Sequence, residues 1–268
     1  MAHHDNIPIW EVEISVIGPV SIREIIRISA RKEIEHSEAF YSKVLIKNNT
    51  NGFTATLTAF APNSELAEKA AIIFFGRMLD VLSLRLSLPL QLDLTNNVII
   101  QKNSENVRRI IDKDDFLLAF ADARLLNLTK TTLSRSLSWF RKGKYSQDPF
   151  DKYLAFWNSI EITSSKYNRN KDACKGKGTK CHIWECFKYV WGNCDKWEFI
   201  GGQKKWIDEC NEIRKNVAHG TIPIDVNSIE RILTKLPDLE NVSQKFLTDW
   251  MLKETEAVVD RQIHSKLR

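Results

Sequence analysis

The first hundred residues contain short runs in which apolar and polar side chains alternate. Residues 7–17 (IPIWEVEISVI) alternate with a period of two, which is typical of a strand with one buried face. Residues 41–47 and 52–60 are rich in β-branched and aromatic side chains, and the turn-forming segment 48–52 (NNTNG) separates them. The pattern therefore predicts a strand followed by a β-hairpin.

A helix is predicted directly after the hairpin. Asn63 or Ser64 can cap its free amides, and Glu65 favours the positive end of the helix dipole. Pro89 indicates that the helix ends near Leu86. Residues 1–111 are therefore expected to form a mixed α/β domain.

From about residue 112 onward, apolar side chains recur at helical spacing. Asp148 followed by Pro149 predicts a helix start, because the carboxylate can cap free amides and proline suits the first turn. Further helices are predicted over residues 116–128, 131–140, 204–218, 227–236 and 241–266, with a polar break at 141–147. The predicted fold class is α+β: the N-terminal domain is followed by an all-α up-and-down bundle over residues 112–268, with a Cys/Lys-rich insert at about 166–200.

The composition indicates a folded protein with a mildly basic surface. Hydrophobic residues make up 43% of the 268 residues and charged residues 27%, which argues against disorder. The formal net charge of +5 suits a polyanionic partner such as RNA. A solvated basic surface without any partner is the alternative interpretation.

No segment has the pattern of a membrane span or of a secretory signal. The most apolar stretch, residues 70–90, is interrupted by Arg77, Asp80 and Arg85. Residues 1–5 show no basic region followed by an apolar run. We therefore expect a cytoplasmic protein whose five cysteines are reduced thiols.

The segment 211–220 (NEIRKNVAHG) combines an arginine and a histidine near a predicted helix end. Arg214 and His219, with their short spacer, resemble the signature of HEPN-domain ribonucleases. The earlier helix, with Asp148-Pro149 and the segment 157–161 (WNSIE), is similar to one in the Apea-like HEPN group. The resemblance implies a metal-independent RNA endonuclease without a cofactor. It also implies a homodimer with two Arg/His pairs in one cleft, and a role such as a toxin or an antiviral effector.

A second arginine–histidine spacing, Arg31 to His36, lies in the α/β region and lacks a following glycine. We therefore assign the signature to the later segment. Many family members have a small polar residue directly after the arginine, whereas this chain has Lys215 there and Asn216 one residue later. Both are taken as supporting residues, and the departure slightly favours a non-catalytic member.

The chemistry of RNA explains why an arginine and a histidine could suffice. RNA supplies its own 2′-hydroxyl nucleophile, so cleavage needs a base, an acid and positive charge on the phosphorane. His219 can act as acid or base, and Arg214 can bind phosphate oxygens. Residues five apart differ by about 140° on an ideal helix, so we expect a left-handed Gly220 to free His219 to turn toward Arg214. Alternatively, Arg214 forms a surface ion pair and His219 is a polar C-cap.

Glu161 is predicted to support this pair. It lies within the apolar stripe of the helix that begins at Asp148, so it should be partly buried and should need a cationic partner. Arg214 or His219 is the expected partner. Alternatively, the stripe ends near Ile160 and Glu161 extends into water.

The insert contains four cysteines and a group of lysines. Free thiols are preferred over zinc ligation, because the cysteine spacings match no common zinc motif; the candidate ligands would be Cys174, Cys181, Cys186 and Cys194. The lysines, followed by several aromatic residues, suit single-stranded RNA; they are Lys175, Lys177 and Lys180. A solvated loop beside tryptophans of the core is the alternative.

These observations favour an RNA endonuclease that acts at a dimer cleft. The alternative is a non-catalytic HEPN-like module that binds RNA, nucleotide or protein, or a regulatory dimerisation domain. No residue in the sequence identifies a protein regulator or the activating signal.

Overall fold

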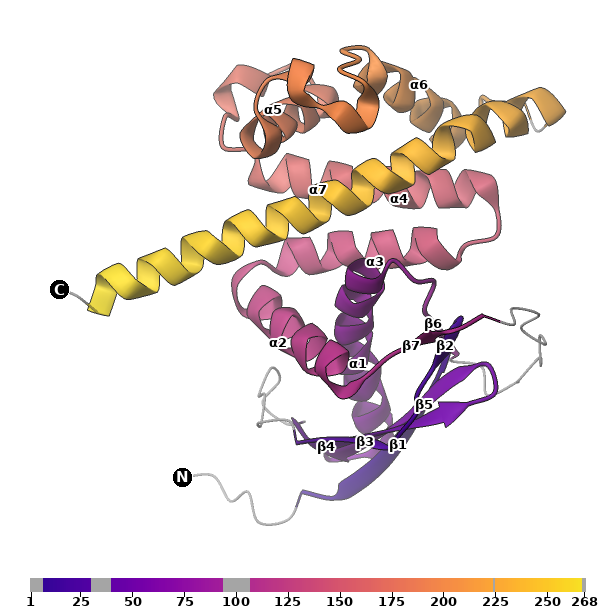
Figure 1. Cartoon of the computed structure of the whole chain (residues 1–268), viewed down its shortest axis with the longest axis vertical. Helices are drawn as coiled ribbons and strands as arrows, with labels where there is room; N and C mark the ends of the chain where they lie inside the picture. The colour runs from indigo at the N-terminus through magenta and orange to yellow at the C-terminus, as the bar shows by residue number, and fades with distance from the viewer. Residues whose placement is uncertain (1–6, 30–39, 94–106, 224, 267–268) are drawn as a thin grey trace. The chain divides into compact units, whose positions relative to one another are not determined.

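The structure of the chain is a computed structural model, shown in Figure 1. It describes residues 7–29, 40–93, 107–223 and 225–266, so the second arginine–histidine spacing at 31–36 lies outside the described residues. The chain divides into two compact units, Met1–Leu128 and Thr129–Arg268. The first combines a sheet with helices, and the described part of the second contains helices without strands, which confirms the α+β class.

An antiparallel five-stranded sheet is the framework of the first unit, with the strand order β3-β4-β5-β1-β6. The strands are β1 (Ile9–Ile17), β3 (Ile26–Ser29), β4 (Phe40–Asn49), β5 (Gly52–Phe60) and β6 (Gln91–Asp93). A short parallel pair joins β2 (Val20–Ser21) to β7 (Arg109–Ile110). The predicted first strand and the hairpin formed by β4 and β5 are both confirmed.

Helix α1 (Ser64–Leu86) begins and ends where the sequence predicts. The Asn63 side chain accepts a hydrogen bond from the Leu66 amide at 2.8 Å, so Asn63 is the cap. Ser87 ends the helix in a left-handed conformation with φ of 54°.

Helix α2 (Lys113–Thr129) groups with the first unit, although we predicted that it begins the bundle. Phe116 contacts Phe53 of β5 at a ring-centroid distance of 5.4 Å. Phe120 stacks on Phe74 of α1 at 5.3 Å. The first unit therefore extends to Leu128, whereas the sequence predicted a boundary after residue 111. The two differ because helical periodicity does not specify which partner a helix packs against.

The second unit is a helical bundle in which α4 contacts each of the four other helices (Figure 1). Its helices are α3 (Thr131–Tyr145), α4 (Pro149–Tyr167), α5 (Thr179–Trp191), α6 (Trp206–Ala218) and α7 (Val226–Lys266). Short 3-10 turns lie at Asp172–Cys174, Cys194–Lys196 and Glu198–Ile200 in the predicted insert. The start of α4 is confirmed, because Asp148 accepts hydrogen bonds from the amides of Phe150 and Asp151, each at 2.9 Å.

Two predicted helix breaks are wrong. Helix α3 continues to Tyr145, and in its last turn Gly143 packs against Phe156 of α4; an added Cβ would lie 2.7 Å from that ring. Helix α7 is one helix with Pro237 inside it, although we expected two. An interior proline costs about 3 kcal/mol, but each large apolar side chain buried along the same face returns about 1.5–3 kcal/mol. That buried face comprises Ile232, Leu236, Leu239, Val242, Phe246 and Trp250.

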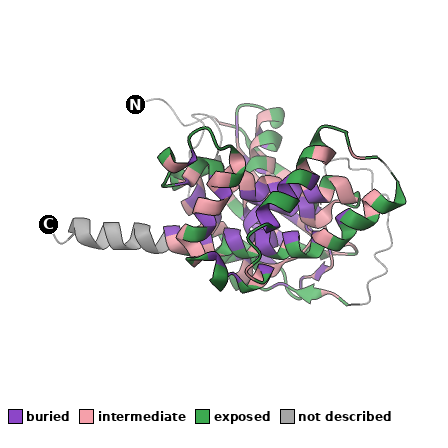
Figure 2. Ribbon diagram, turned by 90° about the horizontal axis from the view of Figure 1, so that it is seen from above, coloured by how far each residue is buried: buried purple, intermediate pink, exposed green. Residues whose placement is uncertain are grey.

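Aromatic side chains fill the interior of the second unit. Phe187 of α5 contacts Trp197, Trp206 and Phe246 at centroid distances of 5.5, 6.5 and 5.1 Å. Of the aromatic residues in the predicted insert, Phe187 and Trp197 are buried in this core, and the others are half-buried: Tyr167, Trp184, Tyr189, Trp191 and Phe199. Figure 2 shows the buried positions on the inward faces of the helices and the exposed positions on their outer faces. Among the described helices, none combines the length and the apolar character needed to cross a membrane.

Candidate functional site

Glu161 lies near the middle of α4 and accepts three hydrogen bonds. The Trp157 indole N–H, one helical turn earlier, donates to Oε2 at 2.7 Å. The Thr179 hydroxyl, at the start of α5, donates to Oε1 at 3.2 Å. The Glu161 side chain is only 19% exposed. The alternative in which Glu161 extends into water is therefore wrong.

Arg214 of α6 is the cationic partner of Glu161, as expected. Its Nη2 lies 3.0 Å from Oε2 and 3.2 Å from Oε1 of Glu161. Nε is buried without a hydrogen-bond partner in the structure, and the side chain as a whole is 27% exposed. Nη1 makes no hydrogen bond within the described part of the chain. Nη1 is therefore the guanidinium nitrogen that could bind an anion without displacing Glu161.

His219 ends α6 and is exposed to solvent. Its amide donates to the Lys215 carbonyl at 2.9 Å, and Gly220 has φ of 63°, so the predicted left-handed helix end is confirmed. Among the described residues, the imidazole has no hydrogen bond or ion pair. The direct contact with Arg214 that we expected is absent within the described single chain. A ring at the helix end is free to contact a ligand or a second copy.

The two supporting residues on α6 differ in what they contact. Lys215 is exposed and lies on the outer face of the helix. Asn216 is half-buried, and its carbonyl oxygen accepts hydrogen bonds from the Thr221 and Ile222 amides at 2.9 and 3.2 Å. Its side-chain oxygen also accepts from the Thr221 hydroxyl at 3.3 Å. Asn216 therefore fixes the path of the chain just after His219.

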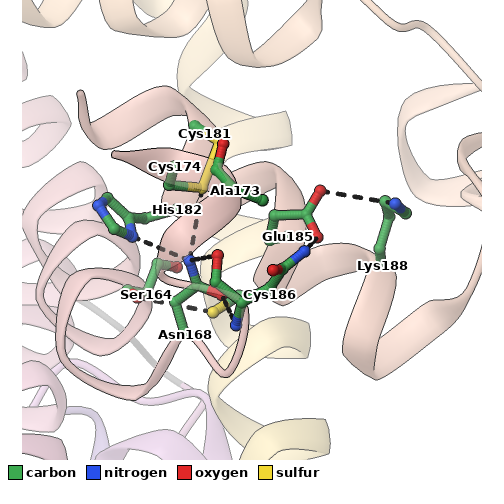
Figure 3. Close-up of a disulfide and its surroundings, with 10 residues drawn as sticks. Ser164, Asn168, Ala173, Cys174, Cys181, His182, Glu185, Cys186 and Lys188 are labelled. Carbon is green, nitrogen blue, oxygen red and sulfur yellow. Dashed lines mark hydrogen bonds and ion pairs between the residues drawn. A yellow bond between two sulfur atoms is a disulfide. The ribbon is translucent and has the colours of Figure 1, made fainter. Parts of the chain in front are cut away.

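The cysteines do not all occur as free thiols, which corrects our prediction. Cys174 and Cys181 form a disulfide (Figure 3). Asn168, which is buried, donates to Cys174 Sγ at 3.5 Å and lies 2.9 Å from His182 Nδ1, and so anchors the disulfide. Sequence spacing did not predict this bond, because we inferred the redox state from the expected compartment rather than from the approach of α5 to the preceding turn.

The remaining cysteines are buried and separate. Burial raises the pKa of Cys186 to about 12 and that of Cys210 to about 11. Burial also raises the pKa of Cys194. No group of three or more metal-ligating side chains occurs among the residues that the structure describes. The four-cysteine zinc set is therefore not assembled, since two of its members are bonded to each other.

The three lysines predicted to contact RNA do not share one site. Lys177 and Lys180 line a pocket beside the start of α5, whereas Lys175 is exposed outside its lining. Lys204 completes the same lining from the segment before α6, more than twenty positions further along the chain. Neither Lys204 nor Thr179 was predicted from the sequence, and no local pattern marks either residue.

Comparison with known proteins finds no relative of this chain. No family model matches it, and neither a curated protein nor a solved structure is similar to it.

Proposed function

We propose that the second unit is an RNA-cleaving domain of the HEPN type, in which Arg214 and His219 act on the RNA phosphate without a metal ion. The observation that carries the proposal is the contrast between these two residues on one helix. Arg214 is oriented by Glu161, while His219, five positions later, presents an unengaged imidazole. One group is positioned for charge stabilisation and the other is free for proton transfer.

The proposed reaction is an internal transesterification. An imidazole removes the proton from the 2′-hydroxyl, and the 2′-oxygen forms a bond to phosphorus. The bond from phosphorus to the 5′-oxygen breaks, and the leaving oxygen takes a proton from a second imidazolium. The products are a 2′,3′-cyclic phosphate and a 5′-hydroxyl, and no water is consumed.

Two imidazole groups are needed for this proton balance, and the proposal obtains the second from another copy of the chain. A homodimer that brings two α6 ends together would provide a base and an acid in one cleft. Nη1 of each Arg214 would then contact the nonbridging phosphate oxygens. Glu161 serves as a positioning residue, because it holds the guanidinium and does not itself reach the reacting atoms.

A non-catalytic RNA- or nucleotide-binding module is the second candidate, and one observation favours it. Glu161 neutralises Arg214 at 3.0 Å, which weakens the field available to a phosphorane. The missing contact between Arg214 and His219 in the single chain is compatible with this alternative. A regulatory dimerisation domain would use the same helix end without any RNA.

The decisive experiment incubates the purified full chain with end-labelled RNA in excess EDTA. We expect cleavage that persists in EDTA, and we expect His219→Ala to abolish it. Arg214→Ala should reduce cleavage strongly while leaving RNA binding measurable. Mass spectrometry of the fragments should find cyclic phosphate ends.

A control variant distinguishes the loss of a catalytic arginine from the loss of one positive charge elsewhere on the surface. Arg231, exposed on α7, provides the control Arg231→Ala for the arginine variant, and its cleavage rate should equal that of the wild type. RNA binding without cleavage by the wild type would decide for the binding module. Neither binding nor cleavage, together with a dimer in solution, would decide for the dimerisation domain.

A further inference from the structure

A pocket of about 260 Å³ lies between the first turns of α5 and the start of α6. Its lining combines charged, aromatic and apolar side chains: Lys177, Lys180, Cys181, Trp184, Lys204, Ile207 and Asp208. Pockets for drug-sized ligands enclose about 300–1,000 Å³. The volume here lies just below that range, so a longer strand would extend beyond the pocket.

The charges in the lining favour an anion. Lys180 pairs with Asp208 at 2.5 Å, in a solvent-exposed ion pair of the kind that contributes little to stability. Lys177 and Lys204 have no hydrogen bond or ion pair from their ammonium groups in the part of the chain that the structure describes. Two unpaired ammonium groups at one pocket can bind a phosphate without displacing an existing partner.

One wall of the pocket is a rigid aromatic ring. Trp184 contacts Trp197 edge-on, with ring centroids 4.9 Å apart. Trp197 is fully buried, and its indole N–H donates to the Gly192 carbonyl at 3.1 Å. Trp184 is half-buried and belongs to the lining of the pocket. Nucleobases stack on such rings regardless of sequence.

The basic side of the pocket is preorganised by the disulfide. The bond from Cys174 to Cys181 (Figure 3) closes the short loop of residues 175–180, which in the sequence includes Lys177. Within the loop, Gly178 adopts φ of 70° and ψ of −173°, a region that is essentially restricted to glycine. The loop therefore has a defined shape before any ligand arrives, which lowers the ordering cost of binding.

We infer that this pocket binds a nucleoside phosphate, with the base against Trp184 and the phosphate between Lys177 and Lys204. The site deepens the proposed function by adding a strand-binding position, but it uses none of the residues that would cleave. Asp208 at the pocket and Arg214 lie six positions apart on α6, or about 9 Å along the helix axis. Because residues six apart also differ by about 120° around an ideal helix, one RNA strand would have to curve around α6 to occupy both sites.

The test measures binding to the full chain in a His219→Ala background, which keeps the RNA intact. The probes are a short fluorescein-labelled single-stranded RNA, followed by anisotropy, and adenosine monophosphate, followed by calorimetry. We expect the double variant Lys177→Gln/Lys204→Gln to bind RNA roughly tenfold more weakly, and Trp184→Ala to lose a comparable factor. Trp184→Phe should retain most of the affinity, because it keeps an aromatic face.

The matched control is Lys171→Gln/Lys196→Gln, which removes two exposed lysines of the same insert outside the pocket. We expect less than a twofold change in its RNA affinity. The salt dependence should also differ: the magnitude of the slope of log K against log[salt] should decrease by about 0.7 for the pocket variant, since the two lysines share one phosphate and each neutralised phosphate of a single strand contributes about 0.7.

The outcomes separate this inference from the nuclease proposal. Binding of adenosine monophosphate with the same variant dependence would assign the pocket to free nucleotides, and binding of RNA alone would assign it to a strand; both support a nucleoside phosphate. Three results would overturn the nucleoside-phosphate site. They are an equal loss of RNA affinity in the pocket pair and the control pair of lysine variants, no effect of Trp184→Ala on RNA affinity, and competition by inorganic phosphate as strong as that by the nucleotide. Wild-type protein that binds RNA through the pocket but never cleaves refutes only the nuclease.

Discussion

The pairing of Glu161 with Arg214 leads to a quantitative prediction about stability. Glu161→Gln removes the charge and keeps one oxygen acceptor, which can serve Trp157 or Thr179 but not both, because an amide nitrogen replaces the second carboxylate oxygen. The half-buried guanidinium of Arg214 then lacks a counter-charge. We expect both Glu161→Gln and Arg214→Gln to destabilise the second unit, and the double variant to lose less than the sum of the two.

The size of the coupling follows from distance and burial. Two unit charges 3.0 Å apart attract by about 5 kcal/mol at an effective dielectric constant near 20. Desolvation of both groups offsets most of this attraction. Exposed pairs give about 0.2–1 kcal/mol, and breaking a fully buried pair costs about 3–5 kcal/mol. With side chains 27% and 19% exposed, we expect a coupling free energy of roughly 1–2 kcal/mol.

Urea unfolding of the wild type, the two single variants and the double variant, followed by tryptophan fluorescence, completes the double-mutant cycle. The coupling should weaken in high salt less than that of the exposed pair formed by Lys180 and Asp208. A coupling below about 0.3 kcal/mol would refute the reasoning, since that value is typical of independent sites. If the pair also orients Arg214 for RNA, Glu161→Gln should slow cleavage without changing RNA affinity.

Three further predictions concern packing, pH and thiol chemistry. Gly143→Ala should destabilise the protein by about 1–2 kcal/mol despite a helix-propensity gain of about 1 kcal/mol, because the new methyl group meets the ring of Phe156; unchanged or increased stability in urea would contradict this. Burial alone would raise the pKa of Glu254, but the ion pairs with Lys130 and Arg169 outweigh burial and lower this pKa. The stabilisation by Glu254 is therefore complete above the pKa of the unfolded state, and it is lost as the pH falls through the lower pKa of the folded state. The stability difference between wild type and Glu254→Gln should therefore shrink on acidification from pH 6 to about pH 3 in thermal melts, and a constant difference would argue against the pairing. Alkylation of the native protein should label no cysteine until a reductant is added, after which half-buried Cys181 should react first; its labelling without reductant would show that the disulfide is absent.

Local patterns in the sequence were sufficient for most of the secondary structure. The alternation in residues 7–17, the turn at 48–52 and the caps Asn63 and Asp148 each involve neighbours in the chain, and the structure confirms the corresponding elements. These signals succeed because backbone hydrogen bonding and capping depend on residues a few positions apart.

Breaks were predicted less well than starts. Pro237 is a strong local stop signal, yet α7 continues through it because the buried stripe on either side is unbroken. The assignment of α2 to the first unit likewise depends on Phe53 and Phe74, which are distant in the sequence from Phe116 and Phe120. Packing against distant partners overrides a local preference.

The sequence by itself determined the candidate pair Arg214 and His219 and the expectation that Glu161 would need a cation. Only the tertiary structure decided that Arg214 is that cation, that Cys174 bonds to Cys181, and that Lys204 shares a pocket with Trp184. The disulfide joins residues only seven apart and depends on how the loop before α5 folds back. For the ion pair and the pocket, the physical reason is that composition and periodicity describe one segment at a time, whereas both require distant segments to meet. That meeting is set by how α5 and α6 pack on α4, which no local pattern encodes.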